Sequence, residues 1–380
     1  MTPATDEPPR SPRGFETPIK THGGDAEDTR RVVRDWLAER LGAADLELSA
    51  ITTPTGTGVA NETVLVDATW SDGGARRSAG FVVRLASAEP FYPDADIRVG
   101  YRMYEALAHV PGVPVPRLYG FEPDTSLLGT PFFVMEKVEG EVPADEPHYT
   151  ATGFVADATP DERRRLWVDA VEVMAGLHQV DSDRVAFLRD APGMGGLAEN
   201  LAWYRAFLDR VEKGTPHEVL RAGHQWLAAN LPTHIPPGLS WGDARVSNMI
   251  FRDHRCVAVL DWDQVSLAGP EADLAWWILM EHPPARVLPG IGTPDDLLDL
   301  WEDRTRRKVT DLHWHVAFTA FRLGVIVLRL FDLMAAAGRM PPDVAVKRSH
   351  NSGPAQQLAL LLGLTPPGEV RATLPDLKRL

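Results

Sequence analysis

The sequence predicts an α+β protein with a strand-rich N-terminal lobe, a mainly helical C-terminal lobe and a cleft between them. Three observations lead to this fold class. Short apolar runs separated by glycine turns dominate the first 140 residues, and apolar residues at helical spacing dominate the remainder. A polar stretch with two strand-like runs, 239–277, interrupts the helices. A strand layer followed by a helix layer is typical of α+β folds, in which ligands bind between the layers.

Composition and charge limit the class of protein. The 380 residues include 44% hydrophobic and 24% charged residues, as in folded soluble proteins. The net charge of −14 argues against nucleic acid or an anionic membrane as a partner, since both attract clustered Lys and Arg. No stretch reaches the ~20 apolar residues of a membrane span. The single cysteine, Cys256, excludes an internal disulfide and favours a cytoplasmic location. The oligomeric state is not predicted.

The N-terminal lobe is expected at residues 29–140, after a tail at 1–28 whose proline and charge content predicts mobility. In the first helix, at 29–41, Val33, Trp36 and Leu37 lie on one face. The sequence SDGG at 71–74 is typical of a turn that joins two antiparallel strands. The other elements expected in this lobe are strands within 46–70, at 78–86 and at 130–140, and a helix at 94–108.

The C-terminal lobe is expected at residues 141–380. Thr159, Pro160 and Glu162 match a capping box with proline in the first turn, so a helix is predicted from 159 to about 178. The long segment before it, 143–159, either forms a lid over the cleft or is a surface excursion. Further helices are predicted at 197–212, 216–230, 295–308 and 311–337.

Four polar residues give the stretch 239–277 its chemical interest: Asp243, Asn248, Asp261 and Asp263. A hairpin through Met249–Phe251 and 256–260 brings the loop before it and Asp261 to the same end. Carboxylate and amide oxygens suit Mg²⁺, and a carboxylate without a metal contact can accept a proton from a hydroxyl. The alternative is that these are turn residues at strand ends, which are common. Composition and spacing alone leave both interpretations open.

The order of the motifs resembles the aminoglycoside and choline kinase-like phosphotransferases of the protein-kinase-like superfamily. WGDARVSN (241–248), LDWDQV (260–265) and GPEADLAWW (269–277) match that family's catalytic loop, metal loop and downstream motif. The resemblance covers about residues 30–340. It is strongest to a subgroup that includes domains fused to acyl-CoA dehydrogenases. It implies a protein-kinase-like bilobal fold with a strand-rich N-lobe and a mainly helical C-lobe.

The resemblance also implies roles for the polar residues. Asp243 is expected to be the catalytic base, and Asn248 and Asp261 are expected to hold Mg²⁺. Asp263 is expected either near the metal or as a solvated carboxylate at a strand end. Asp273 is expected to stabilise the fold by capping the helix that begins near Leu274.

In the N-terminal lobe, the resemblance places a nucleotide loop at GTGVANET (56–63), where Gly58 and Asn61 match the family. Arg84 occupies the position of the phosphate-binding lysine. Its expected partner, a helix glutamate, is replaced by Gly100. The partner is therefore either missing or supplied by Asp94 or Asp96.

The backbone groups of Glu136 to Val138 are expected to hold the purine of the nucleotide. Trp241 replaces the family's usual histidine beneath the catalytic loop and is expected to alter packing rather than chemistry. His178 is expected to be a hydrogen-bonding residue at a helix end. Trp203, Trp276 and Trp277 lie in segments that can line a pocket for the acceptor.

Together these features predict a small-molecule kinase. It would transfer the γ-phosphate of a purine nucleoside triphosphate, ATP or GTP, to a hydroxyl of a metabolite or antibiotic with Mg²⁺ as cofactor. The alternative is a non-catalytic nucleotide-binding or scaffold protein on the same fold, suggested by Gly100 and Trp241. The acceptor itself is not predicted.

Overall fold

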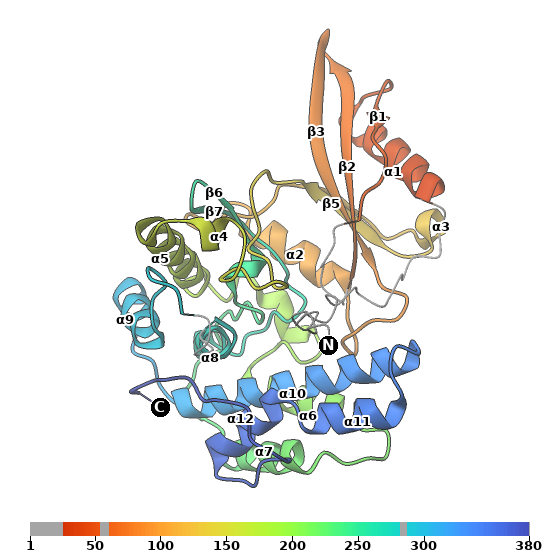
Figure 1. Ribbon diagram of the computed structural model, residues 1–380. Coiled ribbons are helices and arrows are strands. Elements are labelled where there is room, and N and C mark those ends of the chain that lie inside the picture. Colours follow the sequence, from red (N-terminus) through yellow and green to blue (C-terminus); the bar gives the residue numbers. More distant parts are fainter. Residues whose placement is uncertain (1–25, 54–60, 282–286, 380) are drawn as a thin grey trace, which may run out of the picture.

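The computed structural model describes residues 26–53, 61–281 and 287–379, which form an antiparallel sheet next to a larger group of helices (Figure 1). The sheet has five strands in the order β1-β2-β3-β5-β4. The predicted hairpin turn is confirmed, because β2 and β3 pair up to Asp72 and Ala75 and both intervening glycines have positive φ. The strands are β1 Glu47–Leu48, β2 Asn61–Asp72, β3 Ala75–Ala86, β4 Leu118–Glu122 and β5 Phe132–Glu136.

Alternation along the strands gives the sheet two apolar faces, and a helix covers each. In β5, Phe132 faces helix α1, with ring centroids 5.6 Å from Trp36. The next residue, Phe133, faces helix α2, at 6.0 Å from Tyr104. The predicted helices at 29–41 and 94–108 are thus confirmed as α1 Ala26–Leu41 and α2 Ile97–Leu107, and a short helix, α3 Thr125–Leu128, lies between β4 and β5.

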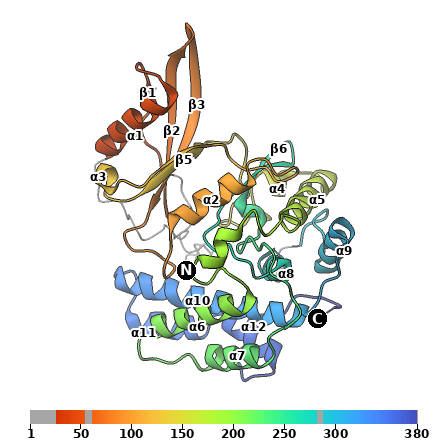
Figure 2. The same cartoon turned by 180° about the vertical axis from the view of Figure 1, so that it is seen from behind.

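The predicted helices of the C-terminal region are also confirmed. Helix α5 begins with the predicted capping box between Thr159 and Glu162, and Pro160 is its first residue. Helix α10 is central and packs against α6, α7, α8, α11 and α12 (Figures 1 and 2). The helices are α4 Phe154–Asp157, α5 Pro160–Leu177, α6 Leu197–Val211, α7 Glu218–Ala229, α8 Pro270–Glu281, α9 Pro294–Thr305, α10 Leu312–Ala336, α11 Pro342–His350 and α12 Gly353–Leu362.

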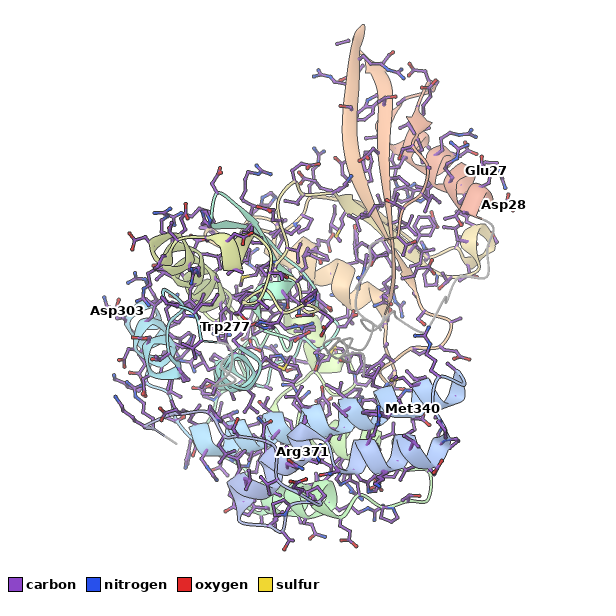
Figure 3. All side chains as sticks on the ribbon, in the orientation of Figure 1. Glu27, Asp28, Trp277, Asp303, Met340 and Arg371 are labelled. Atoms are coloured by element: carbon purple, nitrogen blue, oxygen red, sulfur yellow. The ribbon has the colours of Figure 1, made fainter. Side chains whose placement is uncertain are left out.

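Most charged side chains lie on the outside of these elements, and most large apolar side chains lie within. Figure 3 shows Glu27 and Asp28 at the outer side of α1 and Asp303 at that of α9, whereas Trp277 lies among the helices. None of the helices formed by the described residues has the length and apolar composition needed to cross a membrane.

The stretch 239–277 interrupts the helices with a two-stranded hairpin, as predicted. Its strands are β6 Met249–Arg252 and β7 Arg255–Val259, and the turn residues Asp253 and His254 both have positive φ. The hairpin packs beside α5, where Asp169 accepts hydrogen bonds from the backbone of Cys256 (2.6 Å) and the side chain of Arg255 (2.7 Å). These bonds hold the turn end of the hairpin against α5.

Candidate active site

The loop that precedes the hairpin is anchored by Asp273. One carboxylate oxygen accepts hydrogen bonds from the Ser240 hydroxyl and the Gly242 amide, both at 2.8 Å. The other accepts from the Trp241 amide at 2.6 Å and contacts His178 Nε2 at 2.9 Å. Asp273 lies inside the first turn of α8, which begins at Pro270. Asp273 is therefore a structural residue, as expected, but the prediction that it caps this helix is wrong.

His178 holds the Asp273 carboxylate in place. Its Nδ1 accepts a hydrogen bond from Trp301 Nε1 at 2.8 Å, so Nε2 carries the proton and donates to Asp273. Both side chains of the pair are fully buried. The prediction that His178 is a hydrogen-bonding residue at a helix end is confirmed, since it is the C-cap of α5.

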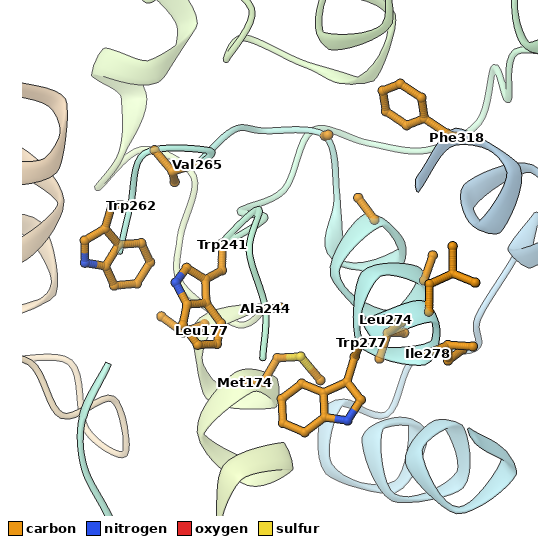
Figure 4. Close-up of a cluster of buried hydrophobic side chains, with 14 of the residues drawn as sticks. Met174, Leu177, Trp241, Ala244, Trp262, Val265, Leu274, Trp277, Ile278 and Phe318 are labelled. Carbon is orange, nitrogen blue, oxygen red and sulfur yellow. The ribbon is translucent and has the colours of Figure 1, made fainter. Parts of the chain in front are cut away.

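Trp241 joins the loops on either side of the hairpin. Its indole Nε1 donates to the carbonyl oxygens of Leu260 and Asp261, both at 2.9 Å. The ring is fully buried, and Figure 4 shows it next to Leu177, with Trp262 further along the same cluster. Packing is thus one role of Trp241, as predicted, and alignment of the Asp261 backbone is a second role that the sequence did not reveal.

Asp243 is 9% exposed and its two carboxylate oxygens have different surroundings. Oδ1 accepts a hydrogen bond from Trp276 Nε1 at 2.7 Å and lies 3.0 Å from Arg245 Nε. The Arg245 contact is an ion pair in which the N–H does not point at the oxygen. Oδ2 has no partner among the described residues, so it is the oxygen that remains available for another molecule.

Asn248 and Asp261 lie side by side near Asp243. The Leu260 amide donates to the Asn248 carbonyl at 2.9 Å, which fixes the two loops together. Asn248 Nδ2 donates to the backbone oxygen of Asp243 at 2.9 Å, and the side-chain oxygen of Asn248 is therefore left as an acceptor. Asp261 has a φ of 62°, a conformation that turns its side chain out of the strand direction.

Burial and neighbouring carboxylates disfavour the charged form of the Asp261 side chain. Burial, and next the charge of Asp263, raise its pKa to about 7, although Arg84 acts in the opposite direction. No three His, Cys, Asp or Glu side chains of the described residues form a complete metal cluster. The Asn248 and Asp261 oxygens nevertheless fit Mg²⁺, which takes few protein ligands and completes its shell with phosphate and water.

Asp263 is bound from the N-terminal sheet. Asn61 Nδ2 lies 3.0 and 3.1 Å from its two oxygens, and Arg84 Nη2 lies 3.5 Å from Oδ2. Its side chain is only 19% exposed, so the interpretation as a freely solvated carboxylate is wrong. Asp263 is instead the residue through which the metal loop contacts the sheet.

Asp263 also supplies the partner of Arg84 that the sequence left open. Burial opposes the charge of Arg84, but the Asp263 and Asp261 carboxylates outweigh it and raise its pKa. Asp96 caps α2 by accepting from the Arg98 amide at 3.0 Å. The prediction that Asp94 or Asp96 is the partner is therefore wrong, because the carboxylate comes from the opposite side of the site.

The expected purine-binding segment lies at the end of β5. The Glu136 amide donates to the Arg117 carbonyl at 2.8 Å, and the Lys137 amide donates to the Gly80 carbonyl at 3.0 Å. The Val138 amide has no intramolecular partner within the described ranges, so it is the backbone donor that remains for a ligand. Gly58, expected in the nucleotide loop, lies outside the described residues.

A narrow cavity adjoins Asp263 and Gln264. Of the tryptophans expected to line an acceptor pocket, Trp203 does line it. Trp276 contacts Asp243 instead, and Trp277 is buried in the helical core. The other walls are formed by Tyr92–Ala95, Pro192–Met194, Asn200, Tyr204 and Val265.

Two residues of the site, Arg245 and Arg322, and one contact of Trp276 were not predicted from the sequence. Arg245, two positions after Asp243, was recognisable as the only cation in its loop. The bond from Trp276 to Asp243 had no recognisable signal. Arg322 had none either, because it interrupts an apolar stretch of α10. It is 2% exposed and donates to the Gly242 carbonyl at 3.0 Å.

The chain is similar in sequence to known proteins. A family model described as the phosphotransferase enzyme family matches residues 51–307. Acyl-CoA dehydrogenase family member 11 of Homo sapiens is 30% identical over 191 residues, which are 49% of this chain. They are only 23% of that protein, so the chain corresponds to about a quarter of the length of this curated relative.

Solved structures give the same fold. A Ralstonia eutropha protein assigned as an aminoglycoside phosphotransferase superposes with a TM-score of 0.61 at 22% identity, over 84% of this chain and 94% of its own. The ADP-bound aminoglycoside phosphotransferase APH(2'')-Ib gives a TM-score of 0.53 at 13% identity, over 89% and 99% of the two chains. At these identities the likeness concerns the fold alone, and it confirms the predicted α+β, kinase-like architecture.

Proposed function

Because the chain belongs to the phosphotransferase enzyme family and is a kinase, we propose that it transfers the γ-phosphoryl group of ATP or GTP to a hydroxyl of a small molecule. The observation that carries this proposal is the arrangement of the loops around Asp243, whose Oδ2 is free. Asn248 donates to the Asp243 backbone, and the amide of Leu260, next to Asp261, donates to Asn248. Family membership also speaks against the alternative of a non-catalytic scaffold.

The donor nucleotide is placed between the sheet and the hairpin loops. In this proposal residues 29–140 form the nucleotide-binding lobe, and residues 141–380 carry the catalytic and metal loops and the acceptor site. Arg84 and Asn61 lie at the end of the sheet nearest the metal loop, where they can donate to phosphate oxygens. The Val138 amide and the Glu136 carbonyl are assigned to the purine, and Gly58 to the loop over the phosphates. The ADP bound to a structural neighbour supports a nucleotide as donor.

Mg²⁺ would be held by the Asn248 side-chain oxygen and the Asp261 carboxylate. When bound, it neutralises phosphate charge and aligns the phosphoryl group for transfer. Asp263 is assigned to Arg84 and Asn61, close to the metal but not as its ligand. The raised pKa of Asp261 supports a cation here, since a positive charge offsets the mutual repulsion of the carboxylates.

In the chemical step Asp243 Oδ2 accepts the proton of the acceptor hydroxyl. The hydroxyl oxygen forms a bond to the γ-phosphorus while the bond from that phosphorus to the bridging oxygen breaks. The products are a phosphate ester and a nucleoside diphosphate. Arg84 and Arg245 lie close enough to the carboxylate cluster to stabilise charge on the transferred group. Most of the rate enhancement would come from positioning and electrostatic stabilisation.

The test compares the wild type with Asp243→Asn on a panel of acceptors. Nucleotide turnover is measured with ATP and with GTP on kanamycin, erythromycin, choline, homoserine and a hydroxyacyl-CoA thioester. The thioester is included because the curated relative is named as an acyl-CoA dehydrogenase family member. A general base contributes about 10²- to 10⁴-fold, so the variant is expected to lose that much kcat while it still binds nucleotide.

Two results would contradict the proposal. An equally active Asp243→Asn enzyme would remove Asp243 from the proton transfer. A wild type that binds neither ATP nor GTP in the presence of Mg²⁺ would remove the nucleotide from the site altogether.

A further inference from the structure

We propose that Trp276 is a positioning residue that holds the Asp243 carboxylate in the rotamer that presents Oδ2 to the acceptor hydroxyl. The inference rests on the proposed function, since it takes Asp243 to be the base. It gives a role to Trp276, which lies in the downstream motif at 269–277 but outside the proposed metal site.

The first argument is the asymmetry of the carboxylate. Both of its side-chain contacts, from Trp276 Nε1 at 2.7 Å and Arg245 Nε at 3.0 Å, go to Oδ1. The Trp276 contact is a buried hydrogen bond with a short, well-formed geometry, whereas the Arg245 N–H is not aimed at the oxygen. The indole is thus the donor that defines the rotation of the carboxylate about its Cβ–Cγ bond.

The second argument is the place of Trp276 on α8. Asp273, three residues earlier on the same helix, holds the backbone amides of Trp241 and Gly242. Residues three apart lie on one face of a helix. One turn of α8 therefore sets the backbone of the loop through Asp273 and the side chain at its end through Trp276.

The third argument is that Trp276 is itself held in place. The Arg322 guanidinium lies 4.6 Å from the centre of the Trp276 ring and donates to the Gly242 carbonyl at 3.0 Å. No carboxylate lies within ion-pair distance of Arg322 in the part of the chain that the structure describes. A cation over the face of an indole attracts the ring and polarises its N–H, which strengthens the bond to the carboxylate.

The neighbouring tryptophan shows that burial alone does not account for the bond. Trp277 is as deeply buried, yet its Nε1 has no hydrogen-bond partner among the described residues. The same holds for Trp167 and Trp262. This core therefore tolerates indole groups without partners, and the bond from Trp276 to Asp243 is not explained by a general need to satisfy them.

The indole has a chemical consequence for Asp243. A neutral donor on Oδ1 leaves the negative charge available on Oδ2. Without it, the carboxylate is free to rotate toward the Arg245 guanidinium and to pair with it through both oxygens, which removes the oxygen that faces the acceptor. Loss of the bond is therefore expected to reduce the chemical step and not the binding of nucleotide.

The kinetic test compares Trp276→Phe with Trp277→Phe. Both variants remove one buried indole N–H and the same volume from adjacent positions. They differ in the bond to Asp243, and both keep an aromatic ring, which in Trp276→Phe still faces Arg322. Turnover of Mg·ATP or Mg·GTP is measured with the acceptor that the panel identifies, or with water as acceptor if none is found. We expect Trp276→Phe to lose about 10- to 100-fold in kcat, with acceptor KM and nucleotide Kd within about threefold. Trp277→Phe is expected to stay within about threefold of the wild type in kcat.

A second measurement tests the contact without activity. In protein labelled with ¹⁵N at the indole nitrogens, Trp276→Phe removes and thereby assigns one resonance. Asp243→Asn is expected to shift that resonance upfield, while Trp277→Phe leaves it in place.

The outcomes separate the two proposals. A wild type with no nucleotide binding or turnover overturns the proposed function. An active wild type whose kcat survives Trp276→Phe, or whose Trp276 resonance ignores Asp243→Asn, overturns the positioning role alone. Equal losses of kcat in the two phenylalanine variants would mean that packing, not the hydrogen bond, is what matters.

Discussion

At the residue scale, the most informative difference from the family pattern is the partner of Arg84. The family pattern pairs this cation with a glutamate on the adjacent helix, but Gly100 stands there and its side-chain space is empty. The counter-charge comes instead from Asp263, on the far side of the site. A nearby carboxylate stabilises a buried guanidinium, whichever element of the fold supplies it.

Arg84→Gln is predicted to weaken nucleotide binding by about tenfold or more, because a charge-assisted bond to phosphate contributes roughly 1.5–3 kcal/mol. Calorimetric titration with Mg·ATP and Mg·GTP measures this. The control is Arg98→Gln, a change at the exposed start of α2, where Arg98 pairs with Asp96. An affinity unchanged by Arg84→Gln would place the phosphates elsewhere.

Asp273 leads to a prediction about stability. Removal of its carboxylate in Asp273→Ala leaves His178 and the loop amides at 241 and 242 buried without an acceptor. We expect a loss of about 3 kcal/mol or more in the free energy of unfolding, measured with urea. Asp303→Ala, which removes an exposed carboxylate paired with Arg304 and Arg306, is expected to change it by less than about 1 kcal/mol. Similar losses in both variants would mean that the anchor is not a stabilising centre.

At the element scale, some helix ends were predictable from the sequence and others were not. The start of α5 was predictable from Thr159, Pro160 and Glu162, because a capping box involves only neighbours in the chain. Helix α7 begins differently. Its N-cap is His217, whose Nδ1 accepts from the Leu220 amide at 3.3 Å and whose ring stacks on His350 at 4.4 Å between centroids.

This unusual cap predicts a pH dependence of stability. Burial, and next the charge of His350, lower the pKa of His217 from 6.5 to about 4. Since the folded pKa lies below the unfolded one, the unfolded chain binds the proton first. The contribution to stability is therefore complete above pH 6.5 and is lost as the pH falls toward 4.

His217→Asn keeps a capping acceptor but does not titrate in this range. Between about pH 7.5 and pH 4.5 we expect this variant to lose less in melting temperature than the wild type. The difference corresponds to about 2–3 kcal/mol at the acid end. Differential scanning calorimetry in matched buffers gives the comparison. Parallel curves for the two proteins would show that His217 does not titrate on unfolding.

At the scale of the whole molecule, the site is where the sheet and the helical region meet. Asn61 and Arg84 come from the sheet, Asp263 from the hairpin loop, and Trp276 from α8. A ligand that binds where these elements meet stabilises the folded chain, since the unfolded chain does not bring these groups together.

We therefore predict that nucleotide raises the melting temperature only when Mg²⁺ is present. At ~100 times Kd the gain is ~2.7 kcal/mol, and EDTA is expected to abolish most of it. Asp261→Ala removes the proposed metal ligand and is expected to abolish the shift that depends on Mg²⁺. Glu302→Gln is a control far from the site, in the ion pairs of α9 with Lys308 and Arg379. A shift of equal size with and without Mg²⁺ in the wild type would contradict the assignment of the metal.

Local sequence patterns were enough to predict most of the helices and strands, and to propose the central residues. The hairpin turn at Gly73 and Gly74, the capping box at Thr159 and the order of Asp243, Asn248 and Asp261 are local patterns, set by backbone conformation and by residues close in the chain. Such patterns are readable because their energetics involve neighbours only.

The contacts between these residues, in contrast, were visible only in the folded chain. Asp263 pairs with Arg84, and Asp273 anchors a loop rather than a helix end. Trp276 and Arg322 support Asp243. These contacts join residues that lie 31 to 179 positions apart in the chain. The 31-position span is Gly242 to Asp273, and the 179-position span is Arg84 to Asp263 (263 − 84). The physical reason is that a buried charge pairs with whichever group packing places within hydrogen-bond distance. The local sequence does not show which distant residue that will be.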